Sequence, residues 1–420
     1  MDVRIYPGGL ALREVRIPTS KSLAHRSIIC AALARGKSII QSVDMSIDIQ
    51  TTIDCICRLG AKVEVSGSDV IVEGVEDINY DGDTVWCNES GSTLRFMIPI
   101  FSLSNKRVRF SGSERLLQRP QEVYQNLFME QGNNFMQSAE EITIEGSIKP
   151  GEISVDGNVS SQFISGLLYV LPLMKEDSTI RITPPFASKS YVDLTIDMLS
   201  KFGIAIQWED ELTLTISGNQ KYKPQKILIE ADYSQLAFYG GLGTLQGPLT
   251  SGGVNKSSLQ GDKQIIDILV RMGANVTWDE NRITFNKSEL NGCSIDLENC
   301  PDLGPMLFML SAFVKGEMHF TNVSRLRIKE SDRVEAMLSE LSKMGIESDS
   351  TENEVWITGG SIKSVDSLDG HNDHRIVMAL AIGATCFEKP TIITGADAIE
   401  KSYPKFFDDL VNLGIKVEVL

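Results

Sequence analysis

The chain has 420 residues, of which 42% are hydrophobic and 23% charged, a composition that is typical of a globular protein and excludes a disordered or fibrous one. Its formal net charge of −16 disfavours nucleic acids and anionic membranes as partners, and its longest uncharged apolar stretches, such as 376–387, fall well short of the roughly 20 residues that span a bilayer. We therefore expect a cytoplasmic protein with no nucleic-acid or membrane partner, whose seven scattered cysteines stay reduced.

The first predicted element is a strand at residues 1–5, and a helical pattern that ends in glycine then recurs six times along the chain. The glycines are Gly60, Gly132, Gly203, Gly273, Gly345 and Gly414, at intervals of 72, 71, 70, 72 and 69 residues. Each stands where the end of a helix requires a left-handed residue. The spacing predicts six copies of one βαβαββ unit.

Two kinds of helix alternate within the predicted units. Amphipathic helices are predicted at 48–59, 120–131, 191–202 and 333–344. Helices that are apolar on nearly every side are predicted at 22–34, 162–174, 303–314 and 375–387. Because a helix that is hydrophobic all round must be buried all round, the pattern predicts a two-domain, inside-out α/β barrel, with buried helices and sheets outside.

Cations gather near the predicted helix starts, where a positive charge opposes the helix dipole. They are Lys21, Arg26, Arg119, Lys189, Lys329, Arg333, Arg375 and Lys401. An anion bound among them would reverse this cost, because free backbone N–H groups, the dipole and the cations would then act together. The pattern predicts that a small polyanion binds between the two domains.

Ten motifs, in chain order, resemble those of the 5-enolpyruvylshikimate-3-phosphate (EPSP) synthases, the 3-phosphoshikimate 1-carboxyvinyltransferases. They lie at 18–22 with 25–26, 90–95, 118–120, 156–157 with 160–162, 188–191, 259–262, 301–302, 327–333, 372–375 and 401–404. The resemblance covers the whole chain. It implies a first domain of residues 1–18 and 231–420, a second domain of residues 19–230, crossings near Pro18 and Glu230, and an active site in the interdomain cleft.

The reaction implied by the resemblance transfers the enolpyruvyl group of phosphoenolpyruvate to the 5-hydroxyl of shikimate 3-phosphate and releases phosphate. By position, the shikimate 3-phosphate site would comprise Lys21, Ser22, Arg26, Ser160, Ser161, Gln162, Ser188, Asp302 and Lys329. The phosphoenolpyruvate site would comprise Lys21, Gly91, Arg119, Gln162, Arg333, Arg375 and Lys401. Asp302 would take the hydroxyl proton, with Glu330 and Lys21 as acid and base toward the enolpyruvyl carbon.

No redox step occurs in this reaction, and the Arg and Lys clusters would neutralise the charge that a metal otherwise would, so no cofactor and no metal is expected. The family's inhibitor glyphosate is an expected ligand, and we expect a monomer. Two positions depart from the commonest family pattern. Many relatives have asparagine at the position of Glu89, and some have asparagine at the position of Arg325.

Several alternatives remain open on the sequence. A sister enolpyruvyltransferase acts on UDP-N-acetylglucosamine and usually carries a reactive cysteine before Arg-Pro, but residues 116–120 contain none. RNA 3′-phosphate cyclases share the repeat unit, and the net charge of −16 counts against them. Asp302 could be only a helix cap, Glu330 and Arg333 only a surface ion pair, and Gly91 only a turn residue.

Overall fold

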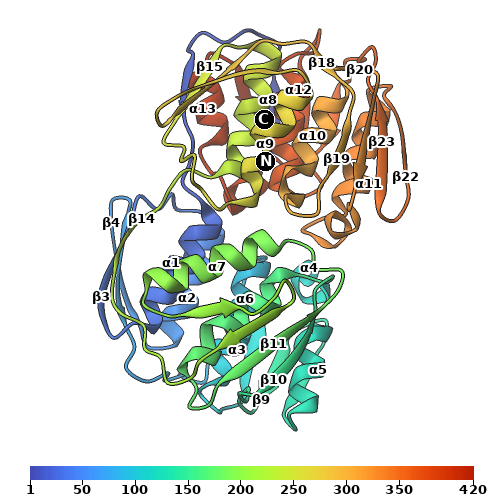
Figure 1. Ribbon diagram of the computed structural model, residues 1–420. Coiled ribbons are helices and arrows are strands. Elements are labelled where there is room, and N and C mark those ends of the chain that lie inside the picture. The colour runs from blue at the N-terminus through green and yellow to red at the C-terminus, as the bar shows by residue number, and fades with distance from the viewer. The chain divides into compact units, whose positions relative to one another are not determined.

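The computed structural model describes all residues, 1–420, and the chain divides into two compact units. One unit comprises Met1–Pro18 and Glu230–Leu420, and the other comprises Thr19–Ile229. In Figure 1 the blue N-terminal segment lies within the unit that is otherwise coloured yellow-green to red, which shows that this unit is discontinuous in sequence. None of the helices combines the length and the apolar character that a membrane span requires.

Each unit contains three four-stranded mixed sheets, so the six sheets agree with the six predicted repeats. In Thr19–Ile229 the first sheet is β14 (Lys226–Leu228), β3 (Gly36–Gln41), β5 (Asp69–Gly74) and β4 (Lys62–Ser66). The second is β6 (Val85–Trp86), β7 (Val108–Ser111), β9 (Ile142–Glu145) and β8 (Asn134–Gln137). The third is β10 (Glu152–Asp156), β11 (Ser178–Thr183), β13 (Thr213–Ile216) and β12 (Ile206–Trp208).

The discontinuous unit repeats this arrangement. Its sheets are β16 (Asn275–Asp279), β17 (Arg282–Asn286), β15 (Leu249–Gly252) and β2 (Glu14–Arg16); β19 (Ser294–Asp296), β21 (Glu317–Thr321), β23 (Glu354–Thr358) and β22 (Glu347–Ser350); and β24 (Ser367–Asp369), β25 (Thr391–Thr394), β1 (Val3–Ile5) and β26 (Val417–Val419). A further pair joins β18 (Leu290–Asn291) to β20 (Val314–Lys315). In every four-stranded sheet one pair is parallel and two pairs are antiparallel.

Two strands are exchanged where the chain passes from one unit to the other. Along the chain β2 precedes the first buried helix, yet it pairs in parallel with β15, with Val15 opposite Ser251. Reciprocally, β14 pairs with β3, with Ile227 opposite Ile40. The N-terminal β1 lies between β25 and β26 and completes the last sheet, whose own repeat ends at residue 420. Pairing between distant segments therefore joins the ends of the chain.

Three helices in each unit are buried on nearly all sides. They are α1 (Lys21–Leu33), α3 (Gly91–Ser102), α6 (Ser161–Val170), α8 (Tyr233–Gln246), α10 (Gly304–Ser311) and α12 (His374–Ala384). Every residue of α10 and of α12 is buried. Figure 1 shows the strands around these helices in each unit. The apolar pattern thus correctly predicted buried helices, because apolar surface on every side must be removed from water.

The remaining helices are amphipathic or short. They are α2 (Ile47–Arg58), α4 (Glu114–Gln118), α5 (Glu122–Glu130), α7 (Lys189–Lys201), α9 (Gln264–Arg271), α11 (Arg333–Lys343) and α13 (Phe406–Asn412). Short 3-10 helices are η1 (Leu171–Leu173), η2 (Gly261–Lys263), η3 (Pro301–Leu303), η4 (Ser324–Ile328) and η5 (Ala396–Lys401). The helix predicted at 162–174 ends as an α-helix at Val170 and continues as η1, where Pro172 supplies no N–H donor.

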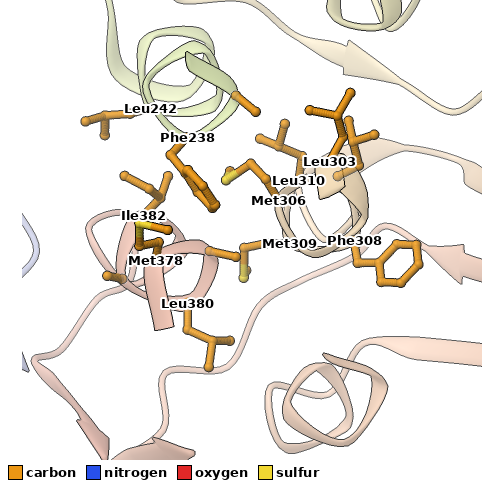
Figure 2. Close-up of a cluster of buried hydrophobic side chains, with 14 of the residues drawn as sticks. Phe238, Leu242, Leu303, Met306, Phe308, Met309, Leu310, Met378, Leu380 and Ile382 are labelled. Carbon is orange, nitrogen blue, oxygen red and sulfur yellow. The ribbon is translucent and has the colours of Figure 1, made fainter. Parts of the chain in front are cut away.

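Part of the core of the discontinuous unit is formed by side chains from the three helices α8, α10 and α12. Figure 2 shows Phe238 of α8, Met306 and Met309 of α10, and Ile382 of α12 pointing toward one another. A Cβ atom added to Gly383 of α12 would lie 2.6 Å from the Sδ and Cε atoms of Met309. The glycine therefore lets α10 and α12 approach more closely than a larger residue would allow.

Candidate active site

In the discontinuous unit, three cations converge on one carboxylate. Asp302, in η3, accepts hydrogen bonds from Lys329 (Nζ–Oδ1 3.3 Å), Arg333 (Nη1–Oδ1 3.0 Å) and Arg375 (Nη2–Oδ2 2.9 Å). The N-cap residue of α10 is Leu303, which makes no side-chain capping bond. Asp302 is therefore more than a helix cap: its carboxylate is the acceptor shared by three positively charged side chains.

Arg333 is the most enclosed of these cations. It is the first residue of α11, its side chain is 1% exposed, and its guanidinium binds Glu330 (Nη2–Oε2 2.8 Å) and Asp373 (Nε–Oδ2 2.8 Å). Burial alone would lower the pKa of Arg333, but Asp373, Glu330 and Asp302 together raise it above the ordinary value. The alternative of a surface ion pair between Glu330 and Arg333 is wrong, because the arginine is buried.

Lys329 is the one cation in this cluster whose charge is destabilised. Burial lowers its pKa to about 8, Asp302 opposes that shift, and Arg333 and Arg325 reinforce it. Arg325, one of the two positions that depart from the family pattern, is itself buried in η4. Lys329 therefore carries a charge that changes with pH close to neutrality.

Arg375 and Lys401 are placed by the segment that precedes α12. Asp373 is the N-cap of α12, and its Oδ1 accepts the backbone N–H of Arg375 at 2.9 Å. Lys401 donates from Nζ to the carbonyl oxygen of Asn372 at 2.6 Å. Both cations are thus held against residues 372–373, one through the cap and one through a backbone carbonyl.

The sequence predicted that the cations lie at helix starts, but four of them do not. Lys329 follows η4 as its C-cap and Lys401 is the last residue of η5. Arg119 is the C-cap of α4, and Arg26 lies in the second turn of α1. For Lys329, Lys401 and Arg119 the reason is that the segment before an amphipathic helix forms a short helix of its own, which places the cation at its C-terminal end, where the dipole favours positive charge.

In the unit Thr19–Ile229, Lys21 and Arg26 are fixed by neighbouring helices. Lys21 is the first residue of α1 and forms an ion pair with Asp48 of α2 (Nζ–Oδ2 2.8 Å). Arg26 is buried, donates to Thr195 Oγ1 (Nε–Oγ1 2.8 Å) and to the carbonyl of Ser22 (Nη1–O 2.9 Å). These contacts tie α1 to α2 and to α7.

Gln162 and its neighbours lie at the start of α6. Ser160 is the N-cap, with its Oγ accepting the N–H of Gln162 at 3.3 Å, and Ser161 is buried beside it. The side chain of Gln162 is held at both ends: Oε1 accepts from Arg95 Nη1 at 2.9 Å and Nε2 donates to Ser92 Oγ at 2.9 Å. Its amide is therefore orientated by α3.

Gly91 is not only a turn residue. It is the first residue of α3, and a Cβ atom at this position would lie 2.6 Å from Nη1 and 2.8 Å from Cζ of Arg119. The missing side chain makes room for the buried guanidinium of Arg119. Ser188, at the N-cap position of α7, is also buried and adopts a left-handed backbone with φ 59°.

Comparisons with known proteins identify the family. The family model of EPSP synthase (3-phosphoshikimate 1-carboxyvinyltransferase) matches residues 9–410. The chain belongs to the EPSP synthase family. A 3-phosphoshikimate 1-carboxyvinyltransferase of Clostridium perfringens is 44% identical to this chain over 407 residues, which cover 96% of each chain. A 3-phosphoshikimate 1-carboxyvinyltransferase of Clostridioides difficile is 38% identical over 435 residues, which cover 99% of this chain and 98% of the relative.

Solved structures show the same fold. The structure of EPSP synthase from Acinetobacter baumannii matches with a TM-score of 0.82 at 23% identity and covers 99% of both chains. The enolpyruvyl transferase NikO from Streptomyces tendae matches with a TM-score of 0.82 at 16% identity, covering 99% of this chain and 98% of that one. As a member of the EPSP synthase family, the chain is an enzyme of the shikimate pathway whose substrates are shikimate 3-phosphate and phosphoenolpyruvate.

Several residues that hold the candidate site side chains were missed from the sequence. Asp48 holds Lys21, Arg95 orientates Gln162, and Asp373 holds Arg333. Arg95 and Asp373 lie inside the motifs at 90–95 and 372–375, which could have drawn attention to them. Asp48 lies on an ordinary amphipathic helix, and no local signal indicates its contact with Lys21.

A buried chain of hydroxyl groups connects α1 to the start of α3. His25 Nδ1 lies 2.7 Å from Thr52 Oγ1, which hydrogen-bonds Thr93 Oγ1, which in turn hydrogen-bonds Ser90 Oγ, each at 2.7 Å. Burial, followed by the charges of Lys21 and Arg26, lowers the pKa of His25 well below its ordinary value. The imidazole is therefore neutral and links the helices without adding charge.

Proposed function

We propose that this chain transfers the enolpyruvyl group of phosphoenolpyruvate to the 5-hydroxyl of shikimate 3-phosphate, with the two substrates divided among the residues described above. The observation that carries this assignment is the group of Lys329, Arg333 and Arg375 around Asp302. Both substrates are phosphorylated carboxylates, and buried cations are the groups that recognise such anions.

Shikimate 3-phosphate is assigned to the hydroxyl-rich helix starts of Thr19–Ile229 together with Lys329. Its phosphate would be bound by Ser160, Ser161 and Lys329. Its ring would contact Lys21, Ser22, Arg26, Gln162, Ser188 and Asp302. In support of this, Ser160 and Ser161 stand at the N-terminus of α6, where the positive end of the helix dipole favours an anion.

Phosphoenolpyruvate is assigned to the residues richest in guanidinium and ammonium groups. These are Lys21, Gly91, Arg119, Gln162, Arg333, Arg375 and Lys401. Arginine suits a carboxylate or phosphate because its planar donors form paired hydrogen bonds. Each substrate is thus assigned residues from both units.

The reaction needs two proton transfers in each of its steps. In the first, the 5-hydroxyl oxygen bonds to C2 of phosphoenolpyruvate, Asp302 takes the hydroxyl proton, and Lys21 or Glu330 protonates the methylene carbon. In the second, the C–O bond to phosphate breaks, Asp302 gives its proton to the leaving phosphate, and a methyl proton is returned to Lys21 or Glu330. The charge on phosphate and carboxylate persists throughout, and fixed cations lower its energy in the transition state.

The substrates would compete with Asp302 for its three cationic partners. Lys329, Arg333 and Arg375 all donate hydrogen bonds to its carboxylate oxygens. Substrate phosphate and carboxylate groups offer these cations other acceptors. The carboxylate oxygens of Asp302 are then open to the hydroxyl proton of shikimate 3-phosphate.

Phosphate release measured with shikimate 3-phosphate and phosphoenolpyruvate tests this function, with UDP-N-acetylglucosamine as the matched alternative acceptor. We expect release that requires shikimate 3-phosphate and is inhibited by glyphosate in competition with phosphoenolpyruvate. Turnover with the UDP-sugar alone would reject the assignment. The cytoplasmic location and the monomeric state stay predictions, and the second is checked by light scattering of the purified chain.

A further inference from the structure

A fully buried carboxylate on α11 has no part in the reaction described above. Glu340 lies two turns after Arg333, and its side chain is 0% exposed. Its Oε1 lies 2.9 Å from His371 Nε2, its Oε2 accepts the backbone N–H of Asp369 at 2.9 Å, and Lys343 donates to both oxygens at 2.7 and 2.8 Å. A buried carboxylate with this many donors holds those donors in place.

The segment that Glu340 holds has an unusual backbone. His371 and Asn372 are consecutive and both left-handed, with φ 49° and 50°. Residues other than glycine are uncommon in this conformation, although asparagine and histidine adopt it more readily than most, and contacts with the surroundings offset its cost. The surroundings here are Glu340, which binds the His371 imidazole, and Asp369, whose Oδ1 accepts the N–H of His371 at 2.8 Å.

The same turn leads directly to two proposed phosphoenolpyruvate ligands. The carbonyl oxygen of Asn372 accepts from Lys401 Nζ at 2.6 Å. The next residue, Asp373, caps α12 through the N–H of Arg375 and binds Arg333 through its carboxylate. A change in the backbone at residues 371–372 would therefore move the acceptor of Lys401 and the first turn of α12 together.

We infer that Glu340 and His371 are positioning residues, which hold the left-handed turn at 371–372 so that Lys401 and Arg375 are orientated for phosphoenolpyruvate. This inference rests on the proposed function, which assigns those two cations to phosphoenolpyruvate. Neither Glu340 nor His371 contacts a substrate in this assignment. Their effect is transmitted through the Asn372 carbonyl and the cap of α12.

Replacement of Glu340 by glutamine removes the charge and leaves a single acceptor oxygen for three donor groups. In the purified full-length Glu340→Gln enzyme, we expect the KM for phosphoenolpyruvate to rise at least about fivefold while the KM for shikimate 3-phosphate stays within about twofold of wild type. Lys343→Met is the matched control, because it removes the half-exposed partner of the same carboxylate and leaves His371 and Asp369 bound. Its two KM values should both stay within about twofold of wild type.

Variants at His371 separate the imidazole contact from backbone strain, and they carry the test if Glu340→Gln does not fold. His371→Gly loses the contact but accepts a positive φ, whereas His371→Ala loses the contact and keeps the strain. We expect the KM for phosphoenolpyruvate to increase in the order wild type, His371→Gly, His371→Ala. Equal values in all three would overturn the inference, even if the melting temperatures differ.

A double-variant cycle with Lys401→Met distinguishes failure of this inference from failure of the substrate assignment. If Glu340 acts through Lys401, the two substitutions are coupled and their combined effect on KM is smaller than the product of the single effects. If Lys401→Met raises only the KM for shikimate 3-phosphate, the substrate assignment is wrong. If Lys401→Met raises the KM for phosphoenolpyruvate while Glu340→Gln raises neither KM, or both equally, the positioning function is wrong.

Discussion

The lowered pKa of Lys329 makes the binding of shikimate 3-phosphate depend on pH just above neutrality. With a pKa of about 8, the Lys329 ammonium is present below pH 8 and is lost as the pH rises through that value. The proposed phosphate contact needs the ammonium form, because a neutral amine offers no charge to a dianion. The KM for shikimate 3-phosphate should therefore rise with pH.

The size of the effect follows from the protonated fraction. For a pKa of about 8, this fraction falls from about nine-tenths at pH 7 to about one-tenth at pH 9, which predicts an increase in KM of about tenfold, or about 1.4 kcal/mol of binding free energy. The second pKa of a phosphate monoester is about 6, so the substrate itself is already a dianion across this range. The KM for phosphoenolpyruvate, assigned mainly to arginines, should change much less.

Initial rates measured from pH 6.5 to pH 9.5 in buffers of constant ionic strength give the profile, and Lys329→Arg is the matched control. Arginine stays charged throughout this range, so the increase in the KM for shikimate 3-phosphate should disappear in that variant. A wild-type KM that is constant from pH 7 to pH 9, or an increase that persists in Lys329→Arg, would refute the reasoning.

The lowered pKa of Lys329 also affects folding. Because the folded-state pKa lies below the ordinary 10.5, the unfolded chain binds more protons than the folded chain between pH 8 and 10.5. The contribution of Lys329 to the free energy of unfolding therefore rises with pH in that window.

Asp302→Asn should lower kcat at least about 100-fold through loss of the base, and turnover within threefold of wild type would remove Asp302 from the mechanism. The same substitution should lower the pKa of Lys329 further, because the Asp302 carboxylate raises the pKa of Lys329. Gly91→Ala should displace the Arg119 guanidinium and raise the inhibition constant of glyphosate more than the KM of phosphoenolpyruvate, and equal changes would contradict a tight site at this position. Leu310→Ala, within the core of Figure 2, should reduce the free energy of unfolding by about 2–5 kcal/mol in urea titrations, and a loss below about 1 kcal/mol would indicate that the core collapses around the cavity.

The sequence by itself determined the repeated architecture and the family. The spacing of Gly60, Gly132 and the later glycines reports helix ends, and continuous apolar stretches report burial, because both are local consequences of backbone geometry and hydration. The motifs at 90–95, 327–333 and 372–375 likewise carry their identity in adjacent residues. Helix boundaries were predicted less well, as at Val170, where an α-helix passes into η1.

Only the tertiary structure decided which of these residues meet. One example is the pairing of β2 with β15 and of β14 with β3. This pairing depends on hydrogen bonding between segments more than 180 residues apart, which no local pattern records. In the same way, the space that Gly91 leaves for Arg119 and the burial of Glu340 against the turn at 371–372 depend on how helices pack side by side. Periodicity specifies which face of an element is buried, whereas the identity of the groups facing it is set by close packing of the whole unit.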